Sequence, residues 1–323
     1  NTNITSETFT TDVYPGFSVT LYDVAQSSSV FGQSFQGAVS LASLGDGLTL
    51  QEINIYANAA AAYNTARTQS LQVSSGDFTV TTATASGTIE WLIDGETYSN
   101  IPGTQTLSDG GLIRITGDRS TITALNLRNN NITAIGRNFL SGMTGLTTLT
   151  SFLQNNYSLT AIPGGLLDDC TLVSNFQSCF AACINLTAIP SGLFDTNTAA
   201  TTFQACFSFS GLTSIPTGLF DNNTSVTTFR DCFSYCNNLT TVPAGLFNNC
   251  TLATNYNNCF FNCALTQQSV DNVLASLVAA GASNGTIGLD GGANAAPSAA
   301  GLADKATLES RGWTVNVNGG GIA

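Results

Sequence analysis

A pattern of apolar positions recurs every 26 or 27 residues through the middle of the chain. Its clearest phrase is Leu-Thr-x-Ile/Val-Pro, in which the leucine and the branched residue before proline are apolar and a threonine stands between them. The four copies begin at Leu159, Leu186, Leu212 and Leu239 and end at Pro163, Pro190, Pro216 and Pro243. A fixed period of this length indicates stacked supersecondary units.

A second phrase, Cys-Phe-x-x-Cys, keeps the same period. Its first position is occupied by Cys179, Cys206, Cys232 and Cys259, and its last by Cys183, Ser210, Cys236 and Cys263. The branched segment before each proline predicts a strand, and the spacing of the cysteine phrase predicts a short helical turn. Strands stacked about 4.8 Å apart would form a parallel ladder. The pattern therefore predicts a leucine-rich-repeat solenoid, with a parallel β ladder on one side and a short helical or irregular convex side.

Residues 1–118 show a different, strand-like pattern. Alternating apolar positions predict strands at 17–22, 48–56 and 112–115, whereas 57–66 fits either a short helix or a loop. The segment 89–93 is followed by Asp94-Gly95, a pair typical of a tight hairpin turn. We expect a small β-rich, sandwich-like domain here.

Residues 266–323 are expected to cap the repeats, whose region spans 119–265. The pattern predicts an amphipathic helix at 269–280, a strand at 286–290, a helix from Pro297-Ser298 to Gly312 and a last strand at 313–317. Capping elements protect the unpaired end of a stack from aggregation. Three domains follow: 1–118, 119–265 and 266–323.

The repeat consensus, Cys-Phe-x-x-Cys-x-x-Leu-Thr-x-Ile-Pro-x-Gly-Leu-Phe, resembles the BspA-like class of leucine-rich repeats over roughly residues 119–265. That class occurs in bacterial surface proteins and in structural proteins of bacteriophages. The segment from Gly291 to Gly301, followed by 308–315, resembles the tail that closes such arrays in phage-encoded proteins. The resemblance implies surface display and binding rather than chemistry. Ser210 departs from the pattern.

The composition of the chain limits the classes of partner that we expect. The chain has no histidine, a single lysine (Lys305), 9% charged residues, a net charge of −12 and a pI near 4.1. Without a basic patch we expect no nucleic-acid binding. The sequence contains no run of 18 apolar residues, so we expect no membrane-spanning segment. Because the chain begins at Asn1 without methionine or a leader pattern, it is expected to be a processed or trimmed product.

Three interpretations of the nine cysteines remain open: buried packing, disulfides between neighbouring repeats, and a metal site. Packing is favoured, because the first cysteines recur at the repeat period and a buried free cysteine behaves as a small apolar residue. A zinc site would need cysteine pairs converging from separate loops. Ser210 replaces a cysteine in one coil, which would remove a ligand from a metal site. With Cys170 and Cys250, which stand outside the phrase, the cysteines number nine, and an odd number cannot all pair in disulfides. Both facts favour packing.

Catalytic chemistry has few candidates. Without histidine no Ser-His or Cys-His nucleophile system forms. The carboxylate pairs Asp168/Asp169 and Asp94/Glu96 could in principle serve a glycosidase, yet both fall in expected turns. Asp-x-Asn-Thr at 195–198 and 221–224 leaves a calcium alternative at the turns. Asn-x-Ser/Thr sequons at Asn156, Asn185, Asn223, Asn238 and Asn249 follow from the repeat consensus. No enzyme activity, cofactor or metal is expected.

Three functions compete at this point. The first is a non-catalytic structural protein on the exterior of a bacteriophage virion, in capsid decoration or a tail fibre. The second is a bacterial cell-surface adhesin, and the third a carbohydrate-active enzyme. In the first, the N-terminal domain would dock to other virion or surface proteins, and the repeats would present a binding surface to host glycans or proteins. Self-association is a further expectation. The virion exterior is the expected location.

Overall fold

The computed structural model describes residues 5–10, 18–23, 69–74, 76–93, 96–99, 104–107 and 111–319. The chain divides into two compact units, Asn1–Thr68 and Gln69–Ala323. The expected boundaries at residues 118 and 265 do not separate these units. Strands on either side of residue 118 pair with each other, for Ile135 lies opposite Leu71. Tyr256 likewise lies opposite Ile287, across residue 265.

In the first unit, the described strands are β1 (Thr5–Thr10) and β2 (Ser18–Asp23), which pair antiparallel. The strand predicted at 17–22 is confirmed, with its bounds shifted by one residue. The strand predicted at 48–56 and the helix or loop at 57–66 lie outside the described residues.

The second unit opens with antiparallel sheets. A five-stranded sheet has the order β11-β3-β9-β6-β7, and two further pairs are β10-β5 and β4-β8. The strands are β3 (Ser70–Val73), β4 (Gly76–Thr79), β5 (Thr82–Ala85), β6 (Ile89–Ile93), β7 (Glu96–Tyr98), β8 (Thr104–Leu107), β9 (Gly111–Gly117), β10 (Ile122–Asn126) and β11 (Ile132–Ile135). A 3₁₀ turn, η2 (Arg119–Thr121), joins β9 to β10.

Two strand predictions in this region are confirmed. β6 and β7 form the expected hairpin, with Ile93 opposite Glu96, and β9 contains the strand predicted at 112–115. Burial alternates along β6, where Trp91 and Ile93 are buried, because successive side chains point to opposite faces of a sheet. These strands share a unit with the repeats, so the prediction of a separate sandwich-like domain is wrong.

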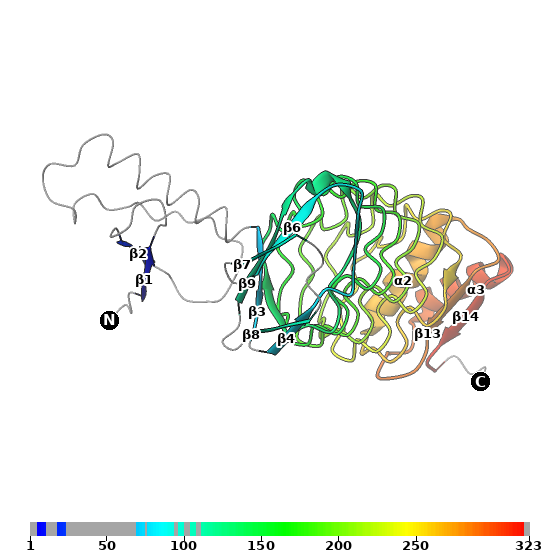
Figure 1. The fold of residues 1–323 in the computed structure, drawn as a ribbon. Helices are drawn as coiled ribbons and strands as arrows, with labels where there is room; N and C mark the ends of the chain where they lie inside the picture. The colour runs from blue at the N-terminus through cyan, green and yellow to red at the C-terminus, as the bar shows by residue number, and fades with distance from the viewer. Residues whose placement is uncertain are drawn as a thin grey trace, which may run out of the picture. The chain divides into compact units, whose positions relative to one another are not determined.

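The repeats follow as a succession of coils, one for each 26 or 27 residues; residues 122–265 are called the coil stack below. Figure 1 shows the coils running from the antiparallel sheets to helix α2 (Gln267–Ala280). Single parallel bridges join equivalent residues of successive coils, namely Ala124, Thr148, Asn175, Thr202, Thr228 and Asn255. Backbone hydrogen bonds also cross between coils, as from the Phe180 amide to the Cys206 carbonyl at 2.9 Å.

The predicted fold class, a leucine-rich-repeat solenoid with a parallel β ladder and helical turns, is wrong. The main sheet of the described chain is five-stranded and antiparallel, and the described helices lie at the C-terminal end. Between β11 and the short strand β12 (Asn255–Tyr256), the described coils contain turns and isolated bridges in place of strands.

Backbone conformation explains the difference. In each coil a positive φ occurs two positions after a fully buried residue, which is Leu149 in the first coil and an aromatic residue in the others. The residues with this positive φ are Ser151, Ser178, Ala205, Asp231 and Asn258. A left-handed residue ends an extended run, so a single bridge remains where a strand was expected. On the other side of the coil, proline follows the branched residue and has no N–H to donate to a ladder.

The cysteine phrase is not helical for the same reason. Ala182, which lies in the phrase that begins at Cys179, also has a positive φ of 56°. Its amide donates to the Ser208 carbonyl of the next coil at 2.7 Å rather than to a residue four positions back. The apolar spacing reflects inward-facing positions of a turn, which periodicity alone does not distinguish from a helix.

An aromatic column fills the interior of the coil stack. The rings of Phe176, Phe203 and Phe229 stack on one another with centroids 5.3 and 5.7 Å apart and nearly parallel planes. Phe194 and Phe220, from the Gly-Leu-Phe phrase, pack against the same column from across the coil at 4.6 and 4.8 Å. All five are fully buried.

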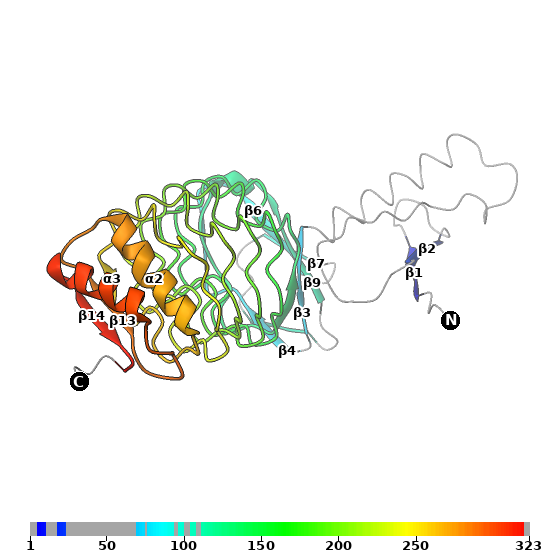
Figure 2. The same cartoon turned by 180° about the vertical axis from the view of Figure 1, so that it is seen from behind.

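The predicted C-terminal elements are confirmed. They are α2, β13 (Thr286–Leu289), α3 (Ala299–Ser310) and β14 (Thr314–Val317). Figure 2 shows α2 and α3 together at this end of the stack, and β12, β13 and β14 form a parallel sheet. The Thr266 hydroxyl caps α2 by accepting from the Ser269 amide, and left-handed Gly281 ends it. In the part of the chain that the structure describes, no helix has the length and apolarity to cross a bilayer.

Candidate functional site

The first cysteines of the repeated phrase lie at equivalent points of successive coils. Cys179, Cys206, Cys232 and Cys259 are each 0% exposed, and they form an inner cysteine column. The sequence predicts this placement from the period alone. All nine cysteines of the chain are free thiols.

The last cysteines of the phrase use their sulfur differently. The thiols of Cys183, Cys236 and Cys263 donate to the carbonyls of Leu153, Phe207 and Phe233, each one coil earlier, at 3.1–3.2 Å. Ser210 takes the corresponding place in its coil, and its hydroxyl lies 3.2 Å from the Cys236 sulfur. A serine is tolerated there because the position already serves a hydrogen bond.

Burial governs the chemistry of these thiols. Desolvation raises the pKa of Cys170, Cys183 and Cys250 to about 12 and that of Cys236 to about 11. It raises the pKa of the inner cysteine column well above the ordinary value. Since the thiolate is the nucleophile and the metal ligand, thiols that stay protonated at neutral pH supply neither.

The leucines and prolines of the repeat have a packing role. Leu159, Leu186, Leu212 and Leu239 are 0% exposed. The amides of Leu159, Leu186 and Leu239 donate to the carbonyls of Asn156, Cys183 and Cys236 in their own coils. Pro163 is buried, and Pro190, Pro216 and Pro243 are half-buried just beyond them. The threonines between these columns, Thr160, Thr187, Thr213 and Thr240, are exposed.

The carboxylate pairs singled out by the sequence belong to turns. Asp169 accepts hydrogen bonds from the Gly142 amide at 2.8 Å and the Ser141 hydroxyl at 2.9 Å, which hold the pKa of its carboxyl below the ordinary value. An ionised group in this role joins one coil to the next and has no proton to give. Glu96 is exposed on β7, and Asp94 lies outside the described residues.

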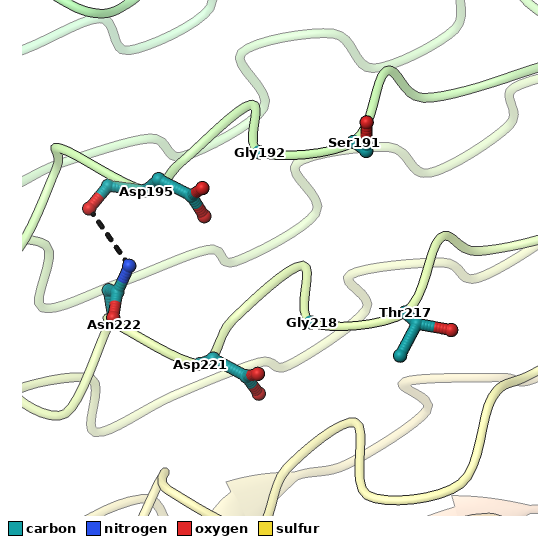
Figure 3. Close-up of a pocket in the computed structure, with 7 residues that line it drawn as sticks. All are labelled: Ser191, Gly192, Asp195, Thr217, Gly218, Asp221 and Asn222. Carbon is teal, nitrogen blue, oxygen red and sulfur yellow. Dashed lines mark hydrogen bonds between the residues drawn. The ribbon is translucent and has the colours of Figure 1, made fainter.

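A shallow depression of about 460 Å³ lies between two successive turns. Figure 3 shows Asp195 and Asp221 on its wall, one from each coil, with their carboxylates projecting in the same direction rather than toward each other. Each carboxylate lies over the left-handed glycine of its own turn, Gly192 or Gly218. The Asn222 amide links the coils by donating to the Asp195 carbonyl at 3.2 Å. This arrangement stabilises turns.

The turns at 195–198 and 221–224 are those for which the sequence left calcium binding as an alternative. Among the described residues, no three histidine, cysteine, aspartate or glutamate side chains come together in a way that could hold a metal ion. The depression is instead lined by exposed hydroxyl, carboxylate and amide groups, which suit hydrogen bonding at a polar surface.

Two of the sequon asparagines are structural. Asn156 and Asn223 are 0% exposed. The Asn156 amide donates to the carbonyls of Leu127 and Leu153 and accepts from the Ile132 amide. These two positions are inaccessible to glycosylation in the folded chain. Asn185, Asn238 and Asn249 are exposed.

An outer column was missed by the sequence analysis. Asn129, Asn155, Ala182, Phe209, Tyr235 and Asn262 occupy equivalent places in successive coils, and all have a positive φ between 55° and 61°. The amide of each of the first five donates to the next coil at 2.7–2.9 Å. Phe209 and Tyr235 are 51% and 37% exposed, and their rings stack 4.4 Å apart at an interplanar angle of 5°. A pointer was present in the sequence, because an aromatic residue immediately before the last position of the cysteine phrase occurs in only these two coils.

No protein family model and no curated protein matches this chain. The resemblance to BspA-like repeats therefore stays a prediction.

Proposed function

We propose that the protein is a non-catalytic structural and display protein on the exterior of a bacteriophage virion. The coil stack holds its surface rigidly because the interior is a continuous aromatic and cysteine core. The exposed turns carry threonine, serine and asparagine, which bind by hydrogen bonds that salt screens weakly. Docking to the particle is assigned to the N-terminal part of the chain, within residues 1–118.

The observation that carries the proposal is the state of the cysteines. Nine free, buried thiols are typical of a protein that folds in a reducing compartment, because secreted proteins of this cysteine content usually form disulfides. The polar, weakly charged surface suits the outside of a particle, and the free thiols in the interior suit folding in the cytosol. Both properties together fit a particle that is assembled inside a bacterial cell. A secreted adhesin would fold in an oxidising environment instead.

The non-catalytic part of the proposal rests on the carboxylates. Asp169 serves a turn, Asp195 and Asp221 project in parallel, and no histidine exists to act as base. A glycosidase needs two carboxyl groups that face each other across a substrate, about 5–10 Å apart.

Immunogold electron microscopy of the native particles or cells that contain this chain tests the proposal. An antibody against the exposed turns is expected to label intact virions, on the head for a decoration protein or on the tail for a fibre component. Label on a cell envelope without virions would contradict the proposal in favour of the adhesin. So would polysaccharide turnover that disappears in the Asp195→Asn/Asp221→Asn variant.

A further inference from the structure

We propose that the outer column contains a binding slot for one pyranose ring of a neutral glycan, located over Ala182. The slot is defined by Asn155, Ala182, Ile184 and Phe209. It rests on the proposed display function for its biological setting and adds a ligand class and a place.

The first wall is the ring of Phe209. One face of this ring is covered by Tyr235 at 4.4 Å, so the exposed 51% of the residue belongs to the opposite face and the edge. That opposite face is directed toward the preceding coil, where Ala182 provides only a methyl group. The aromatic stack thus ends in an open ring face above a small residue. The C–H face of a sugar ring packs on such a surface by dispersion and burial of apolar area.

The second wall is polar. The Nδ2 of Asn155 donates to Oδ1 of Asn129 at 2.7 Å, which makes one step of an amide ladder along the outer column. The next step would be a donor at position 182, where alanine has none. Among the described residues, no side chain donates to Oδ1 of Asn155, so this oxygen is available to accept from a ligand hydroxyl.

The dimensions suit one ring. Asn155 and Phe209 lie two coils apart, which is about 10 Å at roughly 4.8 Å per coil. A sugar stacked about 4 Å from Phe209 leaves space for a hydroxyl and a hydrogen bond of about 2.8 Å to Asn155. Ile184, 53% exposed and two residues from Ala182, adds an apolar side to the slot.

Charge decides the class of sugar. None of the four residues that define the slot is ionisable, and the chain as a whole carries a net charge of −12. Phosphorylated or uronic sugars would be repelled by the overall charge and would meet no cation in the slot. A neutral hexose polymer is therefore the ligand class that fits both walls.

Two substitutions test the slot without disturbing the backbone. Phe209→Asn removes the stacking face and keeps a residue that adopts positive φ readily, as Asn155 and Asn262 do in the same column. Ala182→Phe instead extends the aromatic stack into the slot and removes no apolar surface. Leu252→Asn removes an equally prominent apolar side chain, 60% exposed, elsewhere on the stack and is the matched control.

Binding is measured on the purified full chain by native affinity electrophoresis in gels containing soluble glucan, mannan or galactan. At least one polymer should retard the wild-type chain and Leu252→Asn equally. Phe209→Asn and Ala182→Phe should each bind at least about tenfold more weakly, a loss of 1.4 kcal/mol. Unfolding midpoints recorded in parallel confirm that all variants are folded.

Three results would overturn the slot: no retardation of the wild-type chain by any of the neutral polymers, full binding by Ala182→Phe, or equal loss in Leu252→Asn. None of these bears on where the chain lies on a particle, because that is decided by antibody labelling. A failure of the slot and a failure of the display proposal are therefore distinguishable.

Discussion

Cys206 and Phe209 lie three residues apart in one coil, yet they belong to columns built on different principles. Cys206 is fully buried between Cys179 and Cys232, so its neighbours in both directions are identical to it. Phe209 is half exposed between Ala182 and Tyr235, and its column contains four residue types. The inner column keeps one residue type because every coil must present the same shape to its neighbour for the interior to pack. The outer column varies in residue type, so a ligand can be bound at one coil and not at the others.

Raising the pH across the range in which the buried thiols ionise is expected to give the largest change in stability. Burial raises their pKa in the folded chain, while in the unfolded chain they ionise near the ordinary value of 9.0. The folded state then binds more protons, so stability is fully present below about pH 9 and decreases as the pH rises toward the folded pKa values. The slope approaches about 1.4 kcal/mol per pH unit for each thiol. Urea unfolding at pH 7.5, 9 and 10 should show a loss of several kcal/mol.

A single-thiol variant sharpens that measurement. Cys183→Ser copies the natural Ser210 and should reduce the slope by about one thiol's share, 1.4 kcal/mol per pH unit. Stability that does not change between pH 7.5 and 10 would contradict the burial of protonated thiols.

Truncation of the inner aromatic column comes next. Phe203→Ala removes a ring that stacks on Phe176 and Phe229 and contacts Phe194 and Phe220. We expect a loss of about 3–5 kcal/mol in the free energy of unfolding, measured by chemical denaturation. The control Phe203→Leu should cost less than about 1.5 kcal/mol. Equal losses in the two variants would mean that ring packing is not what stabilises the stack.

Adjacent asparagines separate the two environments within one coil. Asn156→Ala removes the buried side-chain hydrogen bonds to the carbonyls of Leu127 and Leu153 and from the Ile132 amide, so about 1–3 kcal/mol of stability should be lost. Asn155→Gly, at the half-exposed and left-handed neighbour, should change thermal stability by only a few tenths of a kcal/mol. A reversed order would refute the distinction between inner and outer columns.

The smallest effect on stability is expected at the outer aromatics. Phe209→Asn gives up partial burial against Tyr235 and gains a residue suited to a φ of 57°, so the net change should stay within about 0.5 kcal/mol. Thermal unfolding of this variant beside Phe203→Ala contrasts an outer with an inner phenylalanine in the same coil. Destabilisation comparable to that of Phe203→Ala would place Phe209 in the core instead.

Much of the chain's local structure could be predicted, and the reasons are local. Asp94-Gly95 marked the β6–β7 hairpin, Gly312 marked the end of the last helix, and the repeat period placed the cysteines in register. The fold class was wrong because left-handed residues such as Ser178 and Phe209 are not glycines, and nothing in their identity marks the conformation. The predicted boundary at residue 118 does not divide the two units, because β3 and β11 pair across it over about 60 residues. No local sequence pattern reports a pairing of that separation.

The most direct test of this account pairs two measurements on Ala182→Phe and Phe209→Asn: the unfolding midpoint, and retardation by the neutral polysaccharide that binds the wild-type chain. Both variants should have midpoints close to that of the wild-type chain together with at least about a tenfold loss of binding. Retained binding in both, with the midpoints unchanged, would contradict the division between a uniform interior that stabilises and a varied outer column that recognises.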